Sequence, residues 1–150
     1  MSLAQAPVVL LHRTERFSAC HRLHSRHLSD AENREIFGLC NNPNGHGHNY
    51  VWKVTLQGPV HPTTGMVYNL SNLKSEMAQV VRMVDHKNLD LDVDYFHEDG
   101  IVSTTENLTV FLHRELAKVM KRPELLLEST VDETEKNVFT FREIPAAKSL

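Results

Sequence analysis

Apolar and polar residues alternate in two long stretches in the first half of the chain. Over residues 8–23 and again over residues 48–56, neighbouring side chains differ in character, and the first stretch is the less regular of the two. Because successive side chains of a strand leave on opposite faces, this period of two predicts two β-strands. Between them, Ser29 is suited to cap a short helix over residues 31–37, which Gly38 would end.

Helical spacing replaces this alternation in the second half of the chain. In residues 71–84 and 108–120, apolar residues recur every three or four positions, which predicts two amphipathic helices. Residues 103–106, Ser-Thr-Thr-Glu, have the form of a capping box and predict where the second helix begins. Residues 125–131 and 138–141 then return to the strand pattern.

The elements follow in the order strand, strand, helix, helix, strand, strand. This order lacks the strand-helix alternation of parallel sheets and predicts an α+β fold, with a four-stranded antiparallel sheet and two helices on one face. Turn residues lead into residues 66–68, which we expect to return as a short strand, and the acidic residues 85–100 we expect to form a loop. Because such a sheet has two open edges, we also expect oligomerisation through them.

Composition narrows the class of protein. A length of 150 residues predicts one domain over residues 1–150, with loose ends at 1–7 and 145–150. The hydrophobic content of 41% and the net charge of −3 are those of a soluble globular protein, and they give no reason to expect nucleic acid or a membrane as a partner. Two cysteines and no secretory pattern predict a cytoplasmic protein with free thiols.

The sequence His46-Gly47-His48 is the clearest indication of chemistry. In a strand, this spacing places both imidazoles on the same face. A catalytic zinc ion needs three protein ligands and an open position, and we expect His21, near the end of the first strand, to be the third ligand. Three imidazoles favour zinc, although the affinity order alone leaves other divalent metals open. The competing third ligands are His24, His27 and Cys20.

Several other side chains have both a structural and a chemical interpretation. Cys40 is either a small buried apolar residue or a thiol that a nearby cation turns into a base or nucleophile. Asp85 and His86 either complement the C-terminal end of a helix or form a pair for proton transfer. Glu106 fits the capping box, and Glu133 fits an ordinary acidic residue of a hairpin loop.

Six segments resemble, in order, the motifs of the 6-pyruvoyl-tetrahydropterin synthase family. They span roughly residues 14–141, and the segment 37–50 is the most specific. Cys20 departs from the pattern, in which we expect a small residue such as serine. The segments are Phe-Ser-Ala-Cys-His-Arg-Leu (17–23), Phe-Gly-Leu-Cys-Asn-Asn-Pro-Asn-Gly-His-Gly-His-Asn-Tyr (37–50), Thr-Gly-Met-Val-Tyr-Asn-Leu (64–70), Val-Asp-His-Lys-Asn-Leu-Asp (84–90), Val-Ser-Thr-Thr-Glu-Asn (102–107) and Glu-Thr (133–134).

The resemblance implies the tunnelling fold, in which sheets of this kind join edge to edge in a barrel-forming oligomer, here a homohexamer of two stacked trimers. It implies a Zn²⁺ ion held by three histidines and a catalytic thiol at Cys40, to which Asp85 and His86 come from a neighbouring subunit. The implied zinc ligands are His21, His46 and His48, and the implied substrate-binding residues are Thr104, Thr105, Glu106 and Glu133.

The implied activity is that of a carbon-oxygen lyase acting on phosphates. It converts 7,8-dihydroneopterin triphosphate to 6-pyruvoyl-tetrahydropterin and eliminates triphosphate, for which Arg22, Arg26 and Lys87 are candidate cations. One alternative is 6-carboxy-tetrahydropterin synthase of the queuosine pathway, which shares the fold, the zinc histidines and the thiol chemistry. A non-catalytic zinc-stabilised oligomer is the alternative from another class, although a structural zinc ion normally has four protein ligands.

Overall fold

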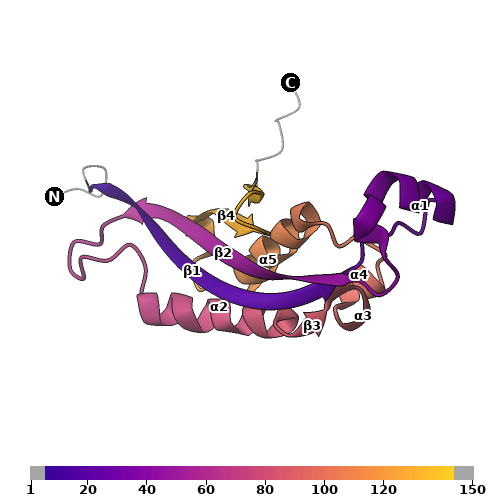
Figure 1. The fold of residues 1–150 in the computed structure, drawn as a ribbon. Coiled ribbons are helices and arrows are strands. Elements are labelled where there is room, and N and C mark those ends of the chain that lie inside the picture. Colours follow the sequence, from indigo (N-terminus) through magenta and orange to yellow (C-terminus); the bar gives the residue numbers. More distant parts are fainter. Residues whose placement is uncertain (1–5, 144–150) are drawn as a thin grey trace, which may run out of the picture.

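The computed structural model describes residues 6–143 of the chain. Residues 1–5 and the expected loose tail at 145–150 lie outside this range. The strands are β1 (Val8–His21), β2 (His46–Pro59), β3 (Lys87–Asn88), β4 (Leu126–Asp132) and β5 (Val138–Phe141) (Figure 1). The helices are α1 (Asp30–Phe37), α2 (Leu70–Val84), α3 (Leu89–Asp92), α4 (Asp94–His97) and α5 (Thr105–Val119), with short 3₁₀ helices η2 (Gly38–Asn41) and η3 (Pro123–Leu125).

The sheet has the strand order β3-β1-β2-β4-β5. β1, β2, β4 and β5 pair antiparallel, which confirms the predicted four-stranded antiparallel arrangement in an α+β fold. The sheet nevertheless has a fifth strand, β3, which pairs parallel with β1 through Lys87 and Asn88. The sequence did not predict β3 because two residues show no period; its pairing depends on where α2 ends.

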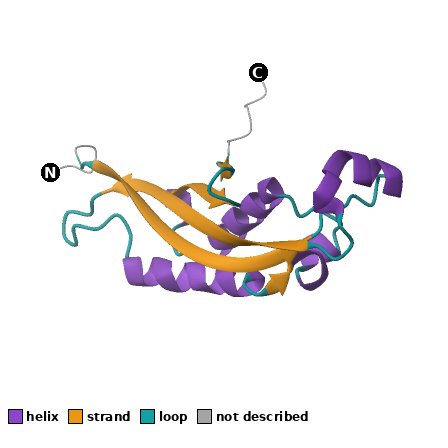
Figure 2. Cartoon of the chain, viewed as in Figure 1, coloured by secondary structure: helices purple, strands orange, loops and turns teal. Residues whose placement is uncertain are grey.

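Helices α2 and α5 cover one face of the sheet (Figures 1 and 2). α2 packs against β1, and α5 packs against β4 and β5. The other face of β1 exposes His12, Thr14 and Arg16. The buried side chains of the covered face are Phe17, Ala19, Tyr50, Trp52, Val54 and Leu56, which meet Leu73, Met77 and Val80 of α2 and Leu108, Leu112 and Leu116 of α5.

The register between β1 and β2 also decides where the histidines lie. The two strands pair without interruption from Val8 opposite Pro59 to His21 opposite His46. A slip of one residue would turn the buried side chains of β2 to the exposed face, and each large apolar side chain contributes about 1.5–3 kcal/mol by its burial. The apolar core therefore fixes His46 and His48 on the same side of the sheet as His21.

Two local expectations about helix starts have different outcomes. Ser29 caps α1 as predicted: its side chain accepts a hydrogen bond from the Glu32 backbone, and the Glu32 carboxylate accepts one from the Ser29 backbone. The capping box predicted for residues 103–106 is wrong. Thr104 is the N-cap of α5 and accepts from the Asn107 backbone at 3.2 Å, because the chain before it turns inward at Ser103.

Two expectations about loops are also wrong. Residues 66–68 form no strand and pair with no strand of the sheet. They follow the turn at residues 62–64, across which the His61 backbone amide donates to the Met66 carbonyl at 3.0 Å. The segment 85–100 is not simply a loop, because it contains β3, α3 and α4. Asn88 begins α3 by accepting hydrogen bonds from two backbone amides with its side chain. Within residues 6–143, every helix is too short or too polar to cross a membrane.

Candidate active site

Three imidazoles meet where β1 ends and β2 begins. His21 lies directly opposite His46 in the strand register, and His48 follows two residues later on the same face. One ring nitrogen from each residue can be chosen so that all three lie within 4.8 Å of one another. The ring centroid of His21 lies 4.6 Å from that of His46 and 5.2 Å from that of His48. The structure thus brings together the three histidines that the sequence pattern singled out.

The surroundings of His21 are those of a metal ligand. Its Nδ1 lies 2.6 Å from the backbone carbonyl of Ser103, and because a carbonyl only accepts, Nδ1 carries the proton. Its Nε2 is buried and has no hydrogen-bond partner among residues 6–143. A buried nitrogen lone pair without a partner is costly in an apolar site, whereas a bound cation would satisfy it. The donor set therefore fits a metal ion.

Burial also keeps the imidazoles in the form that binds metal. It lowers the pKa of His21, with the charges of the neighbouring histidines acting in the same direction. The pKa of His48 is lowered chiefly by burial as well, and the carboxylate of Glu133 opposes this shift. Both rings are therefore neutral at neutral pH, with a lone pair available.

The three competing ligands lie outside this cluster. Cys20 is a free thiol opposite Gly47 in the register, so its side chain leaves on the other face of the sheet. The Nδ1 atom of His24 lies 3.1 Å from the side-chain amide of Asn41. His27 is exposed in the turn that follows. Among the described residues, only His21, His46 and His48 form a group of potential metal ligands.

Cys40 lies half-buried in η2, on a loop tied to the end of β1. Its carbonyl accepts a hydrogen bond from the Leu23 backbone at 2.9 Å. The next residue, Asn41, donates its side-chain amide to the Leu23 carbonyl at 2.7 Å and accepts from Nε of Arg22 at 2.8 Å. These bonds hold the thiol-bearing loop against the two residues that follow His21.

Asp85 and His86 form a hydrogen-bonded pair at the edge of β1. Asp85 accepts from the Ser18 backbone at 3.0 Å with one oxygen, and its other oxygen is 3.0 Å from Nδ1 of His86. The Ser18 amide, more than His86, lowers the pKa of the Asp85 carboxyl. His86 has a φ of 60°, the only positive φ of a non-glycine residue in 6–143, and its backbone donates to the Ser18 carbonyl. Such strain persists only where the surroundings enforce it.

The same pair does not join the Cys40 loop within one chain. His86 is 84% exposed. It lines a shallow pocket together with Cys20, His48 and Asn49, and Cys40 is not among the lining residues.

Among the four predicted substrate-binding residues, Thr105 and Glu133 are hydrogen-bonded to each other, and Thr104 and Glu106 lie at the start of α5. The buried Thr105 donates its hydroxyl hydrogen bond to the half-buried carboxylate of Glu133, whose charge acts on His48. Thr104 uses its hydroxyl to cap α5. Glu106 is exposed in the first turn of that helix and is free of the capping role that the sequence suggested.

Two features of the site were not found by sequence reasoning. The Ser103 carbonyl that orients His21 is a backbone group, and no residue type identifies it. The ring of Tyr50 lies 5.4 Å from that of His48, and its hydroxyl is buried without a hydrogen-bond partner among the described residues. Burial raises the pKa of this hydroxyl, so it stays protonated. Its position two residues after His48 was the one available signal, because alternate strand residues share a face.

Solved structures share this fold. The structure of Caenorhabditis elegans 6-pyruvoyl tetrahydropterin synthase matches with a TM-score of 0.90 and 54% identity, over 93% of this chain and 98% of that one. The Plasmodium vivax 6-pyruvoyl tetrahydropterin synthase matches with a TM-score of 0.66 at 19% identity, over 91% and 98%, and supports the fold alone. The fold and the site therefore define a tunnelling-fold protein with a candidate metal centre.

Sequence comparisons show to which family within this class the chain belongs. The family profile of 6-pyruvoyl tetrahydropterin synthase matches residues 10–144. The 6-pyruvoyl tetrahydrobiopterin synthase of Drosophila melanogaster is 51% identical over 141 residues, covering 93% of this chain and 83% of its own length. The human enzyme of that name is 50% identical over 127 residues, covering 84% and 86%. The chain belongs to the 6-pyruvoyl tetrahydropterin synthase family and is an enzyme of the lyase class.

Proposed function

We propose that the chain is a zinc-dependent 6-pyruvoyl-tetrahydropterin synthase, which converts 7,8-dihydroneopterin triphosphate to 6-pyruvoyl-tetrahydropterin and releases inorganic triphosphate. The main observation in support of metal dependence is the buried Nε2 atom of His21. It lacks a hydrogen-bond partner within residues 6–143 and faces two further imidazoles. The names of the Drosophila and human relatives support the identity of the product.

The metal would be held by His21, His46 and His48, and a three-nitrogen set of this kind would leave a coordination position open. When bound, zinc supplies a Lewis acid that makes protons of the substrate side chain more acidic. The chain itself contributes the orientation of the ligands. The Ser103 carbonyl fixes the His21 ring, and the register of β1 against β2 fixes the other two.

Proton transfer falls to Cys40, Asp85 and His86. Asp85 accepts the Nδ1 hydrogen of His86, which leaves Nε2 of His86 free to take up or deliver a proton. The strained, exposed position of His86 suits a group that acts on a neighbouring chain. In a homohexamer of two trimers, with sheets joined at the edges that β3 and β5 leave open, this pair would serve the Cys40 thiol of the adjacent subunit.

The pterin ring is bound by carboxylates near the first turn of α5. Glu133 is fixed by the Thr105 hydroxyl through one oxygen, so its second oxygen can accept a hydrogen bond from a pterin N–H group. Glu106, exposed at the same helix end, supplies a second acceptor. Thr104 acts by holding the helix start in place. We place this reaction in the cytoplasm, a reducing compartment in which free thiols such as Cys20 and Cys40 persist.

A product assay on zinc-loaded protein tests this proposal. Wild type, Cys40→Ala and Cys20→Ser are given 7,8-dihydroneopterin triphosphate, and triphosphate release and the pterin product are followed. Cys20 is the matched control, because it is the other free thiol and leaves on the far face of the sheet. A 6-pyruvoyl product that is lost only in Cys40→Ala supports the proposal.

The other outcomes separate the alternatives. A 6-carboxy product would move the chain to the queuosine pathway while keeping the same site. No turnover by folded, metal-loaded protein would contradict the enzymatic proposal for this substrate. In that case the non-catalytic zinc-stabilised oligomer predicts that Cys40→Ala and Asp85→Asn leave metal content and assembly unchanged.

A further inference from the structure

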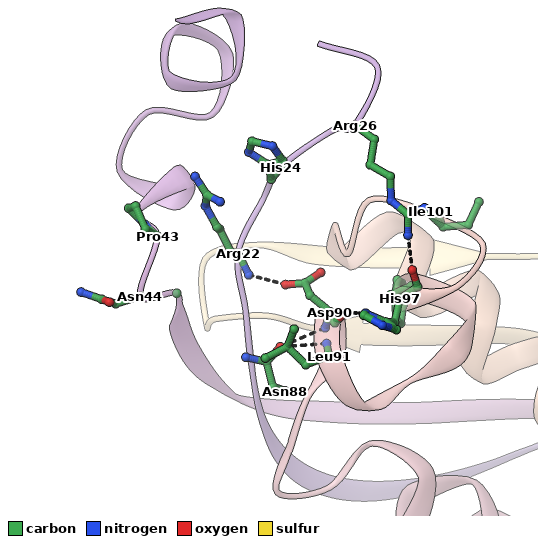
Figure 3. Close-up of a pocket in the computed structure, with 13 residues that line it drawn as sticks. Arg22, His24, Arg26, Pro43, Asn44, Asn88, Asp90, Leu91, His97 and Ile101 are labelled. Carbon is green, nitrogen blue, oxygen red and sulfur yellow. Dashed lines mark hydrogen bonds between the residues drawn. The ribbon is translucent and has the colours of Figure 1, made fainter. Parts of the chain in front are cut away.

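A pocket of about 490 Å³ lies next to the histidine cluster and carries two guanidinium groups (Figure 3). Arg22 and Gly45, which line it, are the neighbours in sequence of His21 and His46. Arg26 lines the same pocket. The third cation considered for the triphosphate, Lys87, lines a different pocket, which it shares with His48 and His86. The structure therefore separates Arg22 and Arg26 from Lys87.

Neither arginine of this pocket is neutralised by a carboxylate. The guanidinium of Arg22 donates to the backbone carbonyl of Asn41 at 2.8 Å, and that of Arg26 donates to the backbone carbonyl of His97. Neither takes part in an ion pair with an acidic residue among residues 6–143. Each guanidinium has five N–H groups, so both keep donors free for a ligand.

Both side chains are also positioned rather than freely extended into solvent. Arg22 is half-buried, and its second contact is the side-chain oxygen of Asn41 at 3.4 Å. The guanidinium of Arg26 lies over Gly100, where a Cβ atom would be 2.9 Å from Cζ. Holding a guanidinium in advance reduces the entropy lost when it binds a ligand.

Asp90 is the one carboxylate among the described residues that line this pocket. One of its oxygens accepts a hydrogen bond from the backbone amide of Arg22 at 2.6 Å, as Figure 3 shows. Asp90 thus holds the chain directly after His21, and its charge opposes an anion. Two arginines face this single carboxylate, so the local balance favours an anion in a chain whose net charge is −3.

From this arrangement we infer that the pocket lined by Arg22 and Arg26 binds a linear oligophosphate. Guanidinium groups bind phosphate oxygens in paired hydrogen bonds, and two of them beside one cavity suit a chain of phosphates better than a single anion. The ligand is either the triphosphate tail of the bound substrate or free triphosphate. The first assignment rests on the function proposed above, whereas affinity for an oligophosphate does not.

Calorimetric titration with inorganic tripolyphosphate tests the pocket directly. Arg22→Gln and Arg26→Gln are each expected to weaken binding by about tenfold or more, since each removes a charged donor. Asp90→Asn keeps an oxygen for the Arg22 amide and removes the opposing charge, so it is expected to tighten binding. Arg82→Gln, at an exposed position on α2 outside the pocket, is the matched control and is expected to bind as wild type.

Tripolyphosphate also chelates metals, so His48→Ala is titrated in parallel. Binding that persists in His48→Ala but falls in both arginine variants supports the inference. No measurable binding to wild type, binding lost in His48→Ala alone, or arginine variants that bind as wild type would each overturn it. Arg26 is exposed, so Arg26→Gln keeps the test valid if Arg22→Gln disturbs the Cys40 loop.

Steady-state kinetics then identify the source of the phosphates. A raised KM for 7,8-dihydroneopterin triphosphate with little change in kcat in the arginine variants assigns the pocket to the substrate tail. An unchanged KM beside weakened tripolyphosphate binding supports the pocket and assigns it to free triphosphate. If no variant turns over, the proposed function fails while the titration still decides on the pocket.

Discussion

The ring of His21 is fixed by the backbone carbonyl of Ser103, which accepts its Nδ1 hydrogen at 2.6 Å. This bond joins the end of β1 to the residue before the N-cap of α5, over 82 positions of sequence. It selects the tautomer of His21 and turns Nε2 toward the other two imidazoles. The geometry of the proposed metal centre therefore depends on how α5 packs against the sheet, as well as on the strand pattern.

Replacing a cluster histidine should remove the metal without unfolding the chain. We expect wild type to bind about one zinc ion per chain in a three-histidine site. His46→Ala should lower the zinc content severalfold or more. His27→Ala is the control, because His27 is exposed and lies outside the cluster. Elemental analysis of purified proteins measures the content, and undiminished zinc in His46→Ala would contradict the assignment.

Glu133→Gln should weaken binding of the pterin substrate more than it slows the chemistry. The amide keeps an acceptor for the Thr105 hydroxyl but removes the charge near His48. A hydrogen bond to a charged group contributes about 1.5–3 kcal/mol, so KM should rise by about tenfold or more. Glu135→Gln, exposed in the same hairpin, should behave as wild type. Equal KM values in the two variants would exclude Glu133 from the binding site.

His113 should make the fold less stable in acid. It is buried and bonded to the Ser129 hydroxyl at 3.0 Å, and burial lowers its pKa below the ordinary 6.5 despite the opposing charge of Glu143. The unfolded chain therefore takes up this proton at a higher pH than the folded chain. The contribution of neutral His113 to the free energy of unfolding is complete above pH 6.5 and is lost as the pH falls below that value.

Urea unfolding of wild type and His113→Gln between pH 7 and pH 5 measures this effect. The free energy of unfolding of wild type should fall more steeply with decreasing pH than that of the variant. Comparison of the two proteins removes the contribution of other histidines, such as His21, that titrate in both. Parallel curves would show that His113 is not responsible.

Tyr68 should stabilise the packing of α2 against the end of α5. Its hydroxyl lies 2.7 and 2.8 Å from the two oxygens of the buried Glu76, and it accepts from the Lys121 backbone at 3.1 Å. Tyr68→Phe leaves that carboxylate with one fewer donor, which should cost about 1–3 kcal/mol in the free energy of unfolding.

The matched control for this substitution is Tyr95→Phe. The hydroxyl of Tyr95 forms no hydrogen bond within residues 6–143, and its ring packs against Phe96 and Phe111 in the same way as phenylalanine would. Denaturant unfolding compares the two variants. Equal losses of stability would mean that the Tyr68 hydroxyl contributes nothing beyond its ring.

Local patterns predicted the parts of the fold and site that depend on local geometry. The alternation in β1 and β2 and the spacing of His46 and His48 follow from the two-residue period of a strand, so the paired imidazoles could be predicted. The start of α5 was misplaced by one residue, because Ser103 and Thr104 are both good caps and tertiary contacts chose between them.

Features that depend on long-range contacts could not be predicted from local sequence patterns. β3 exists only because α2 ends beside Ser18, and the carbonyl of Ser103 carries no side-chain signature. The buried Tyr50 hydroxyl beside the site belongs to a residue for which the strand pattern indicated no chemical role. The role proposed for His86 needs a second chain, so it likewise depends on assembly.

The most direct measurement is turnover before and after removal of the metal. The protein is stripped with a chelator, given 7,8-dihydroneopterin triphosphate, and then resupplied with zinc, while triphosphate release and the pterin product are monitored. The account predicts no turnover by stripped protein that remains folded, and formation of 6-pyruvoyl-tetrahydropterin once zinc is restored. Full turnover without any bound metal, or none after one zinc ion per chain is restored, would contradict it.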